Sequence, residues 1–305
     1  MSWAVAASGL IATWQIPVYR FDMSWFSPSL PFLSWIPFAA LLVAVPIASA
    51  EEGATEVVPR PRAHAHNDYY HKRPLKDALS HGFCSVEADV YFIGGRLLVA
   101  HSILEIQPDK TLERLYLDPL LKRVRQNARD TNQPGRVFAD GPTFTLMIDI
   151  KQNGPKVYAR LQKVLPYYRE MLTRVEDGKL IEGAVRVIVS GDRPQKQIRE
   201  SQIRYVGIDG RLSDLDSKQP AHLLPLISDR WTSHFKWRGD GPIPSDEKLK
   251  LKKIVRQAHE KGRRVRFWAT PENKAVWQEL YDADVDLINT DRLAELKKFL
   301  ASQKP

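Results

Sequence analysis

Short apolar segments alternate with amphipathic helical patterns along most of the chain, and this alternation limits the folds open to it. Helical patterns cover residues 155–175, 245–261, 273–283 and 291–300. Segments rich in β-branched and aromatic residues, bounded by polar turns, are typical of buried strands. Eight such segments are predicted, at residues 62–66, 83–92, 145–151, 185–190, 205–208, 223–228, 264–269 and 286–289.

Alternating strands and helices favour parallel pairing, because each helix then forms a crossover between neighbouring strands. Eight such units predict an α/β protein with a closed (β/α)8 TIM barrel, whose active site lies at the carboxyl ends of the strands. A doubly wound open sheet is the alternative, but the chain lacks a glycine-rich turn after the first predicted strand. Residues 94–101 predict a hairpin that returns a short antiparallel strand toward the second strand.

The amino-terminal part reads as a leader. Residues 23–50 contain no charged side chain, and Ala48-Ser49-Ala50 precedes the acidic pair that starts at Glu51. A small-x-small sequence after an apolar segment is typical of a cleaved secretory signal, so we expect export to the periplasm or the extracellular space. An uncleaved membrane anchor is the alternative. The predicted organisation is therefore a leader at 1–50, a linker at 51–61 and the barrel at 62–305.

The chain carries 45 basic and 36 acidic residues, giving a formal net charge of +9. Such a charge favours anionic partners, among them phosphodiesters and lipid surfaces. Nucleic acid is not expected, since no groove-reading or base-stacking motif is present. The aromatic segment 231–237 either contacts a lipid surface or packs inside a loop. Cys84 is the single cysteine, which excludes an intramolecular disulfide.

Three carboxylates lie in the second and third predicted strands. Glu87 and Asp89 are two residues apart, so both project from the same face, as do Asp149 and Lys151 on the next strand. Buried carboxylates require a cation, and three of them with no thiolate favour Mg²⁺ or Ca²⁺ over zinc. Lys151 can neutralise a phosphoryl oxygen. The structural alternatives are a solvent-facing Glu87 and Asp89, and an internal Asp149–Lys151 salt bridge.

Three histidines lie near these carboxylates in the predicted barrel. His64 and His66 share a face at the end of the first strand, and His101 returns from the predicted hairpin. Breaking a phosphodiester requires a base for the attacking oxygen and an acid for the leaving oxygen, and imidazoles perform both tasks near neutral pH. An H-x-H pair is also typical of amidohydrolase and polymerase-histidinol-phosphatase-like metal sites. That alternative predicts further histidines, yet none lies between His101 and His222.

Several motifs together resemble the altered-inheritance-of-mitochondria-six-like proteins, in the superfamily of glycerophosphodiester phosphodiesterases and phosphatidylinositol-specific phospholipase C. The resemblance covers residues 60–300. The motifs that carry it are Ala63-His64-Ala65-His66-Asn67-Asp68-Tyr69, Arg73-Pro74-Leu75, Glu87-Ala88-Asp89-Val90, Leu98-Val99-Ala100-His101, Leu115-Tyr116-Leu117-Asp118-Pro119-Leu120, Arg266-Phe267-Trp268-Ala269-Thr270 and Ile288-Asn289-Thr290-Asp291-Arg292.

The resemblance implies a phosphoric diester hydrolase acting on a glycerophosphodiester or a phospholipid-type substrate. It implies that Glu87, Asp89 and a later carboxylate bind the divalent cation, and that His101 and one first-strand histidine act as acid and base. His66 is preferred to His64 because its distance to Glu87 is nearer the family spacing. The chain departs from the usual His-Arg-Gly motif, and Asp149-Ile150-Lys151 resembles the sphingomyelinase D branch. A non-catalytic ligand-binding barrel is a further alternative.

Overall fold

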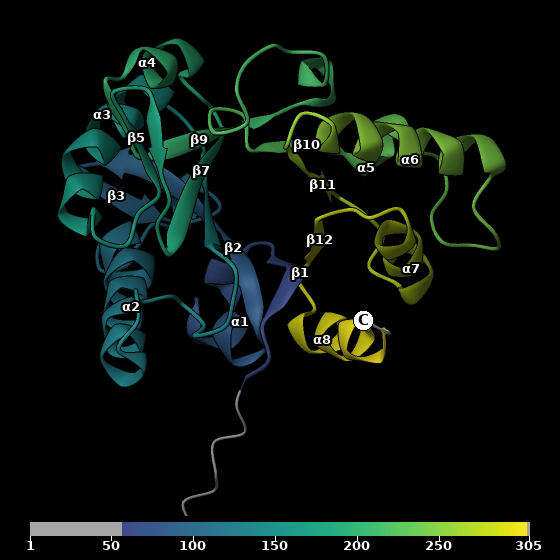
Figure 1. The fold of residues 1–305 in the computed structure, drawn as a ribbon, viewed down its shortest axis with the longest axis horizontal. Coiled ribbons are helices and arrows are strands. Elements are labelled where there is room, and N and C mark those ends of the chain that lie inside the picture. Colours follow the sequence, from purple (N-terminus) through teal and green to yellow (C-terminus); the bar gives the residue numbers. More distant parts are fainter. Residues whose placement is uncertain (1–56, 304–305) are drawn as a thin grey trace, which may run out of the picture. The chain divides into compact units, whose positions relative to one another are not determined.

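The computed structural model describes residues 57–303, and within them eight parallel strands close into a barrel (Figure 1). The strands pair in the order β1-β12-β11-β10-β9-β7-β4-β2, and β2 pairs with β1 to complete the ring. The barrel strands are β1 (Arg60–Ala65), β2 (Phe83–Ile93), β4 (Phe144–Ile150), β7 (Val185–Gly191), β9 (Val206–Gly210), β10 (Leu226–Arg230), β11 (Arg264–Trp268) and β12 (Leu287–Thr290).

Each strand expected from the sequence overlaps one of these eight, so the predicted (β/α)8 fold class is confirmed. The predicted hairpin is also present, since β3 (Arg96–Val99) pairs antiparallel with β2. Gly94 and Gly95 form its turn with φ angles of 57° and 77°. Such a turn requires positive φ at both central residues, a conformation that glycine adopts without strain.

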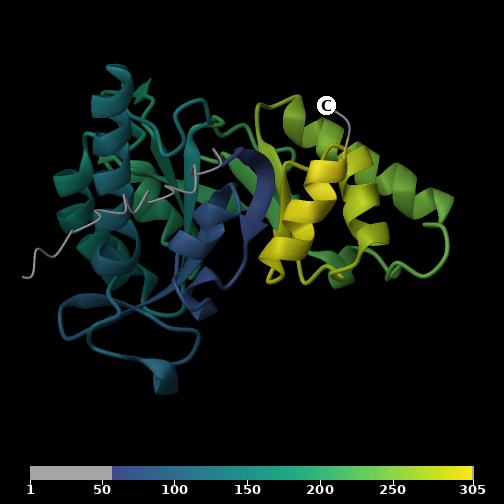
Figure 2. The same cartoon turned by 90° about the horizontal axis from the view of Figure 1, so that it is seen from below.

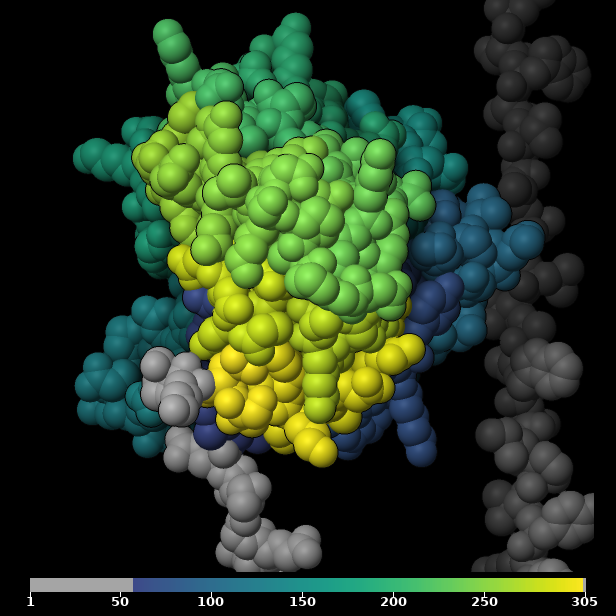
Figure 3. Space-filling model, turned by 90° about the vertical axis from the view of Figure 1, so that its right-hand side faces the viewer, coloured from purple at the N-terminus to yellow at the C-terminus, as the bar shows by residue number. Residues whose placement is uncertain are grey.

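Helices cover the outside of the barrel, with α2, α3 and α4 on one side and α6, α7 and α8 on the other (Figures 1 and 2). Figure 3 shows the second side, where α6 lies above the two carboxyl-terminal helices. The α-helices are α1 (Lys76–Ser80), α2 (Asp118–Thr131), α3 (Gly154–Val164), α4 (Gln195–Glu200), α5 (Trp231–His234), α6 (Ser245–His259), α7 (Lys274–Asp282) and α8 (Leu293–Ser302).

Short helical turns and a small sheet complete the connections. The turns are η1 (Asp68–Tyr70), η2 (Ile103–Glu105), η3 (Glu113–Leu117), η4 (Leu165–Tyr168) and η5 (Leu212–Asp214). The sheet contains β5 (Arg174–Glu176), β6 (Lys179–Ile181) and β8 (Ile203–Arg204). The predicted helix at 155–175 is therefore too long. Pro166 has no backbone N–H to continue the α-helical hydrogen bonds, and the chain turns into η4 and then β5.

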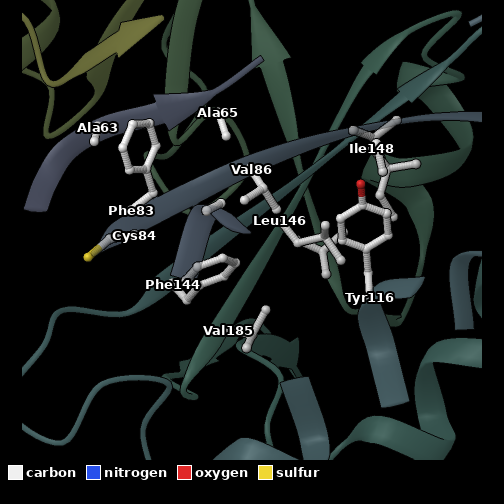
Figure 4. Close-up of a cluster of buried hydrophobic side chains, with 14 of the residues drawn as sticks. Ala63, Ala65, Phe83, Cys84, Val86, Tyr116, Phe144, Leu146, Ile148 and Val185 are labelled. Carbon is white, nitrogen blue, oxygen red and sulfur yellow. The ribbon is translucent and has the colours of Figure 1, made fainter. Parts of the chain in front are cut away.

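The two faces of the barrel strands have different compositions. Outward-facing residues such as Ala63, Val86, Leu146 and Ile148 are fully buried under the helices (Figure 4). Inside the barrel, one small apolar layer consists of Met147, Ile188, Leu226 and Leu287. The remaining interior is polar and buried, with His64, Ser85, Glu87, Asp89, Asp209, Ser228, Arg266 and Asn289. The period of two residues along each strand therefore separates the packing face from the chemical face.

The predicted leader at 1–50 lies outside the described residues, as does most of the predicted linker. Among residues 57–303, no helix has the length and apolar character that a membrane-spanning segment requires. The aromatic segment that starts at Trp231 is packed rather than exposed. Trp231 stacks on Phe235 at 4.0 Å between ring centroids, and both lie edge-on to Phe267. The lipid-facing interpretation of this segment is therefore wrong for Trp231 and Phe235, which are completely buried.

The loop that follows β1 is organised around the buried carboxyl group of Asp68. Its Oδ2 accepts hydrogen bonds from the Leu75 backbone N–H at 2.6 Å and from the Tyr116 hydroxyl at 2.9 Å. Leu75 has a φ of 61°, which is strained for a leucine, so this hydrogen bond supports an unfavourable backbone conformation. Burial raises the pKa of Asp68 to about 7.

Asp68→Asn should make the free energy of unfolding less dependent on pH. Between the unfolded pKa of 3.8 and the folded pKa of about 7, the folded protein keeps a proton that the unfolded chain loses, so the wild type loses stability as the pH rises. The stability of the variant relative to the wild type should therefore increase by up to about 1.4 kcal/mol per pH unit in this range. Urea denaturation across the range measures it. A difference that stays constant with pH would show that Asp68 is ionised throughout.

Candidate active site

The strand register brings three carboxylates together at the carboxyl end of the barrel. Asp89 of β2 lies directly opposite Asp149 of β4, which lies opposite Ser190 of β7. Oxygens of Glu87, Asp89 and Asp149 all lie within 4.8 Å of one another. Glu87 is 6% exposed and Asp89 is 1% exposed, so the alternative in which this pair faces solvent is wrong.

Glu87 is paired with a buried arginine from the far end of the chain. Arg266 of β11 donates from Nη2 to Glu87 Oε2 at 2.8 Å and from Nε to Asn289 Oδ1 at 2.9 Å. Burial alone would raise the pKa of Glu87, but Arg266, followed by His64, holds it well below its usual range. Arg266 was not predicted as a site residue from the sequence. An arginine near the middle of a predicted barrel strand, two residues after Arg264, is the signal that could have identified it.

Lys151 joins the other two carboxylates. Its Nζ lies 2.6 Å from Asp89 Oδ2 and 2.7 Å from Asp149 Oδ2, so the internal salt bridge considered from the sequence is present. Burial and then the Glu87 charge raise the pKa of Asp89 to about 6, against the opposing effect of Lys151. Burial lowers the pKa of Lys151, but Asp149 and Asp89 outweigh it and hold that pKa above its usual range.

The cluster has the properties of a divalent cation site. Asp89 Oδ1 is buried and has no hydrogen-bond partner among residues 57–303, which is costly for a carboxylate oxygen unless a cation approaches it. Glu87, Asp89 and Asp149 carry three negative charges against the two positive charges of Arg266 and Lys151. The donor atoms are all carboxylate oxygens, the type that Mg²⁺ and Ca²⁺ prefer. These residues therefore fit a hard divalent cation.

His66 and His101 line the same cavity as Glu87 and Asp149. His66 Nδ1 lies 2.8 Å from Asp291 Oδ1, and His101 Nδ1 lies 3.1 Å from Asp89 Oδ2. In both rings this contact leaves Nε2 for a ligand, since no hydrogen bond to either Nε2 is formed within the described part of the chain. Burial lowers the pKa of His66, but the hydrogen bond to Asp291 and the charge of Glu87 raise it above its usual value.

His64 occupies a different position. It is fully buried, with Nδ1 2.7 Å from Ser85 Oγ and Nε2 3.3 Å from Glu87 Oε2, and it does not line the cavity. Burial, and next the charge of Arg266, lower its pKa to about 3, so the ring is neutral near pH 7. Among the described residues, the candidate metal cluster consists of Glu87, Asp89 and Asp149 and includes no histidine. This geometry does not support the amidohydrolase-like alternative.

Tyr69 is a second residue to which the sequence analysis gave no role. Its hydroxyl donates to Asp89 Oδ2 at 2.6 Å and lies 3.1 Å from His101 Nδ1. Burial and the charge of Asp89 raise the pKa of Tyr69 far above its usual value, so the hydroxyl stays protonated. Tyr69 therefore fixes Asp89 and His101 relative to each other, and its place in the His66-Asn67-Asp68-Tyr69 motif was the available signal.

The cavity at this end of the barrel has a volume of about 350 Å³. A similar cavity of about 380 Å³ lies among residues near the amino ends of the strands, including Cys84, Thr145 and Arg264, but none of the carboxylates or histidines described above line it. Barrel enzymes place their chemistry at the carboxyl ends, which favours the first cavity. That cavity is lined by His66, Asn67, Glu87, His101, Asp149, Lys151, Ser190, Gly191, Arg211, Arg266 and Trp268.

Replacement of Arg266 by Met should strongly destabilise the metal-free protein, because Glu87 would be left buried and unpaired. Breaking such a pair costs about 3–5 kcal/mol. The Glu87→Gln/Arg266→Met double variant should recover much of this loss, since it removes both charges. Urea denaturation in chelator gives the free energies of unfolding, with Arg230→Met, which changes a more exposed arginine, as the control. A cost below about 1 kcal/mol for Arg266→Met would contradict the assignment of this pair.

The sequence profile of the AIM6-like phosphodiesterase domain matches residues 52–209, and that of the glycerophosphoryl diester phosphodiesterase family matches residues 264–294. The altered inheritance of mitochondria protein 6 homolog of Arthroderma benhamiae is 31% identical over 270 residues, which cover 80% of this chain and 84% of that protein. The altered inheritance of mitochondria protein 6 of Eremothecium gossypii is 29% identical, and the aligned residues cover 78% of this chain and 69% of that protein.

Among solved structures, a glycerophosphodiester phosphodiesterase from Parabacteroides distasonis superimposes with a TM-score of 0.45 at 15% identity, covering 80% of this chain and 98% of that one. A glycerophosphodiester phosphodiesterase from Agrobacterium tumefaciens gives a TM-score of 0.43 at 14% identity, covering 80% of this chain and all of that one. The profile match over more than half of the chain and the 31% identity to the Arthroderma homolog confirm the predicted family. The chain belongs to the family of AIM6-like phosphodiesterase domain proteins.

Proposed function

We propose that the protein is a metal-dependent phosphoric diester hydrolase that uses His66 and His101 as its acid and base. One observation carries this proposal: Glu87 and Asp149, two members of a carboxylate cluster suited to a hard cation, line the same cavity as two histidines with an available Nε2. Family membership supports a phosphodiesterase-type reaction, and the basic charge of the chain favours anionic substrates.

Glu87, Asp89 and Asp149 would hold the divalent cation, Mg²⁺ or Ca²⁺. When bound, such a cation neutralises part of the phosphodiester charge and polarises a phosphoryl oxygen. Arg266 keeps Glu87 ionised and fixes its Oε2. In this structure Lys151 Nζ lies 2.6 Å from Asp89 and 2.7 Å from Asp149, and a cation that binds these carboxylates would release it toward the substrate. As negative charge develops on the phosphoryl oxygens, the Lys151 ammonium provides further stabilisation.

The two histidines divide the proton transfers. His101 Nε2 takes a proton from the attacking water, while Asp89 and Tyr69 hold its Nδ1 side. His66 Nε2 gives its proton to the oxygen of the leaving alcohol, and its raised pKa favours the protonated form that this role requires. One P–O bond forms, one breaks and one proton moves at each end, which yields a phosphomonoester and an alcohol. His64 supports Glu87 and transfers no proton.

The substrate class we propose is a small phosphodiester of the glycerophosphodiester or phospholipid type. A cavity of about 350 Å³ lies at the small end of the range for ligand pockets, so it suits a headgroup phosphodiester. A non-catalytic ligand-binding barrel is the second candidate. Lys151 favours it, because an ammonium group that bridges Asp89 and Asp149 neutralises part of the cluster without any metal.

A panel of phosphodiesters, tested in chelator and with added Mg²⁺ or Ca²⁺, separates the two candidates. We expect hydrolysis of at least one glycerophosphodiester that depends on the metal. His66→Ala and His101→Ala should each lower kcat by about 10² to 10⁴, because each variant lacks one proton-transfer group. His71→Ala is the matched control, because His71 lies in the same loop as His66 but does not line the cavity.

Circular dichroism and thermal unfolding of each variant check that folding is retained. Binding of a phosphodiester with no turnover in any metal would support the ligand-binding barrel instead. A His101→Ala variant with wild-type kcat would exclude His101 as the base.

A further inference from the structure

Arg211 lines the cavity at the carboxyl end of the barrel, on the side opposite His66. It directly follows β9, and β9 is four strands from β1 in both directions around the ring, through β12, β11 and β10 or through β2, β4 and β7. In an eight-stranded barrel these two strands are opposite each other. Arg211 and His66 therefore line opposite sides of one cavity of about 350 Å³.

Among residues 57–303, the guanidinium of Arg211 is anchored through Nη1 alone. Nη1 donates to Asp209 Oδ2 at 2.8 Å and to the Gly210 carbonyl at 2.9 Å. The Asp209 carboxylate is buried and also accepts from Ser228 Oγ at 2.6 Å and from Ser190 Oγ at 2.7 Å. The anchor is thus rigid, and it fixes the plane of the arginine side chain before any ligand binds.

The other nitrogens of Arg211 remain available. Its Nε and Nη2 donate to no residue in the described part of the chain, and together they form the edge of a guanidinium that binds a carboxylate or phosphate in bidentate fashion. The other cations that line the cavity differ. Lys151 is bonded to Asp89 and Asp149, and Arg266 is bonded to Glu87 and Asn289.

We propose that Arg211 forms a second anion subsite, which selects phosphodiesters whose alcohol carries an additional carboxylate or phosphate group. This inference rests on the proposed function, because the scissile phosphodiester must sit at the carboxylate and histidine side of the cavity. A neutral or cationic headgroup leaves the Arg211 donors without a partner, whereas an anionic headgroup receives two charge-assisted hydrogen bonds.

The test uses four glycerol phosphodiesters of similar size, with ethylene glycol, ethanolamine, glycolate or ethylene glycol phosphate as the second alcohol. The wild type should show the higher kcat/KM on the glycolate and phosphate esters, and the two arms distinguish a carboxylate from a phosphate preference. Arg211→Gln should lower kcat/KM on the preferred anionic ester by roughly 10- to 100-fold, and on the glycol ester by less than roughly 3-fold.

Two further variants control for folding and for charge. Arg211→Lys keeps a positive charge beside Asp209 but removes the planar pair of donors, so it should recover only part of the selectivity. In Arg193→Gln the lost guanidinium contacts the Asp209 carbonyl without lining the cavity, and selectivity should be unchanged. Activity on the glycol ester reports folding of the catalytic site in each variant.

Equal losses on all four esters in both Arg211 variants would overturn the proposal, because Arg211 would then serve the scissile phosphate or the fold. A wild type without headgroup preference would also overturn it. If no ester is hydrolysed, the proposed function fails, and calorimetry with 2-phosphoglycolate and 2-hydroxyethyl phosphate still decides the subsite. Tighter binding of phosphoglycolate that is lost in Arg211→Gln supports it, and equal binding of both ligands overturns it.

Discussion

Three carboxylates lie close together inside the barrel, and the structure depends on the cations that neutralise their charge. Glu87, Asp89 and Asp149 come from adjacent strands, and desolvation of three negative charges is unfavourable unless cations lie within hydrogen-bond distance. Arg266 of β11 forms an ion pair with Glu87, and Lys151, directly after β4, forms ion pairs with Asp89 and Asp149. One negative charge remains, and a divalent cation is the partner that we propose for it.

The alternation of side chains along the strands keeps the charged residues away from the apolar core. Alternate residues of β2 and β4 point outward, where Val86 and Leu146 pack against helices, while Glu87 and Asp149 point inward. The interior apolar layer is confined to four side chains, so the carboxyl end of the barrel is free to carry polar groups. Loops then add the groups that act on a ligand: His66 after β1, His101 after the hairpin and Arg211 after β9.

The sequence predicted the barrel and the carboxylate cluster because both depend on local patterns. Spacing of two residues places Glu87 beside Asp89 on one face, and the cost of burying them implies a cation. Arg266 could not be paired with Glu87 in this way, because the two residues are 179 positions apart and meet only when the barrel closes. His64 and His66 share a face but differ in burial and in partners: His64 is fully buried against Ser85, and His66 lines the cavity beside Asp291. The predicted helix ends at Val164 because of Pro166. The helical periodicity of the apolar residues continues past this proline and so did not reveal the end.

Lys151 and a divalent cation would bind the same two carboxylates, Asp89 and Asp149, so locating the cation is the most direct test of a metal-dependent site. A crystal soaked in Mn²⁺ and measured for anomalous scattering would locate a bound cation without relying on activity. A metal-dependent site predicts one strong peak among carboxylate oxygens of Glu87, Asp89 and Asp149, with Lys151 Nζ moved away from its present 2.6 Å contact with Asp89. A crystal with no peak there, and with Lys151 still bonded to both aspartates, would show that the lysine itself is the resident cation and would contradict a metal-dependent site.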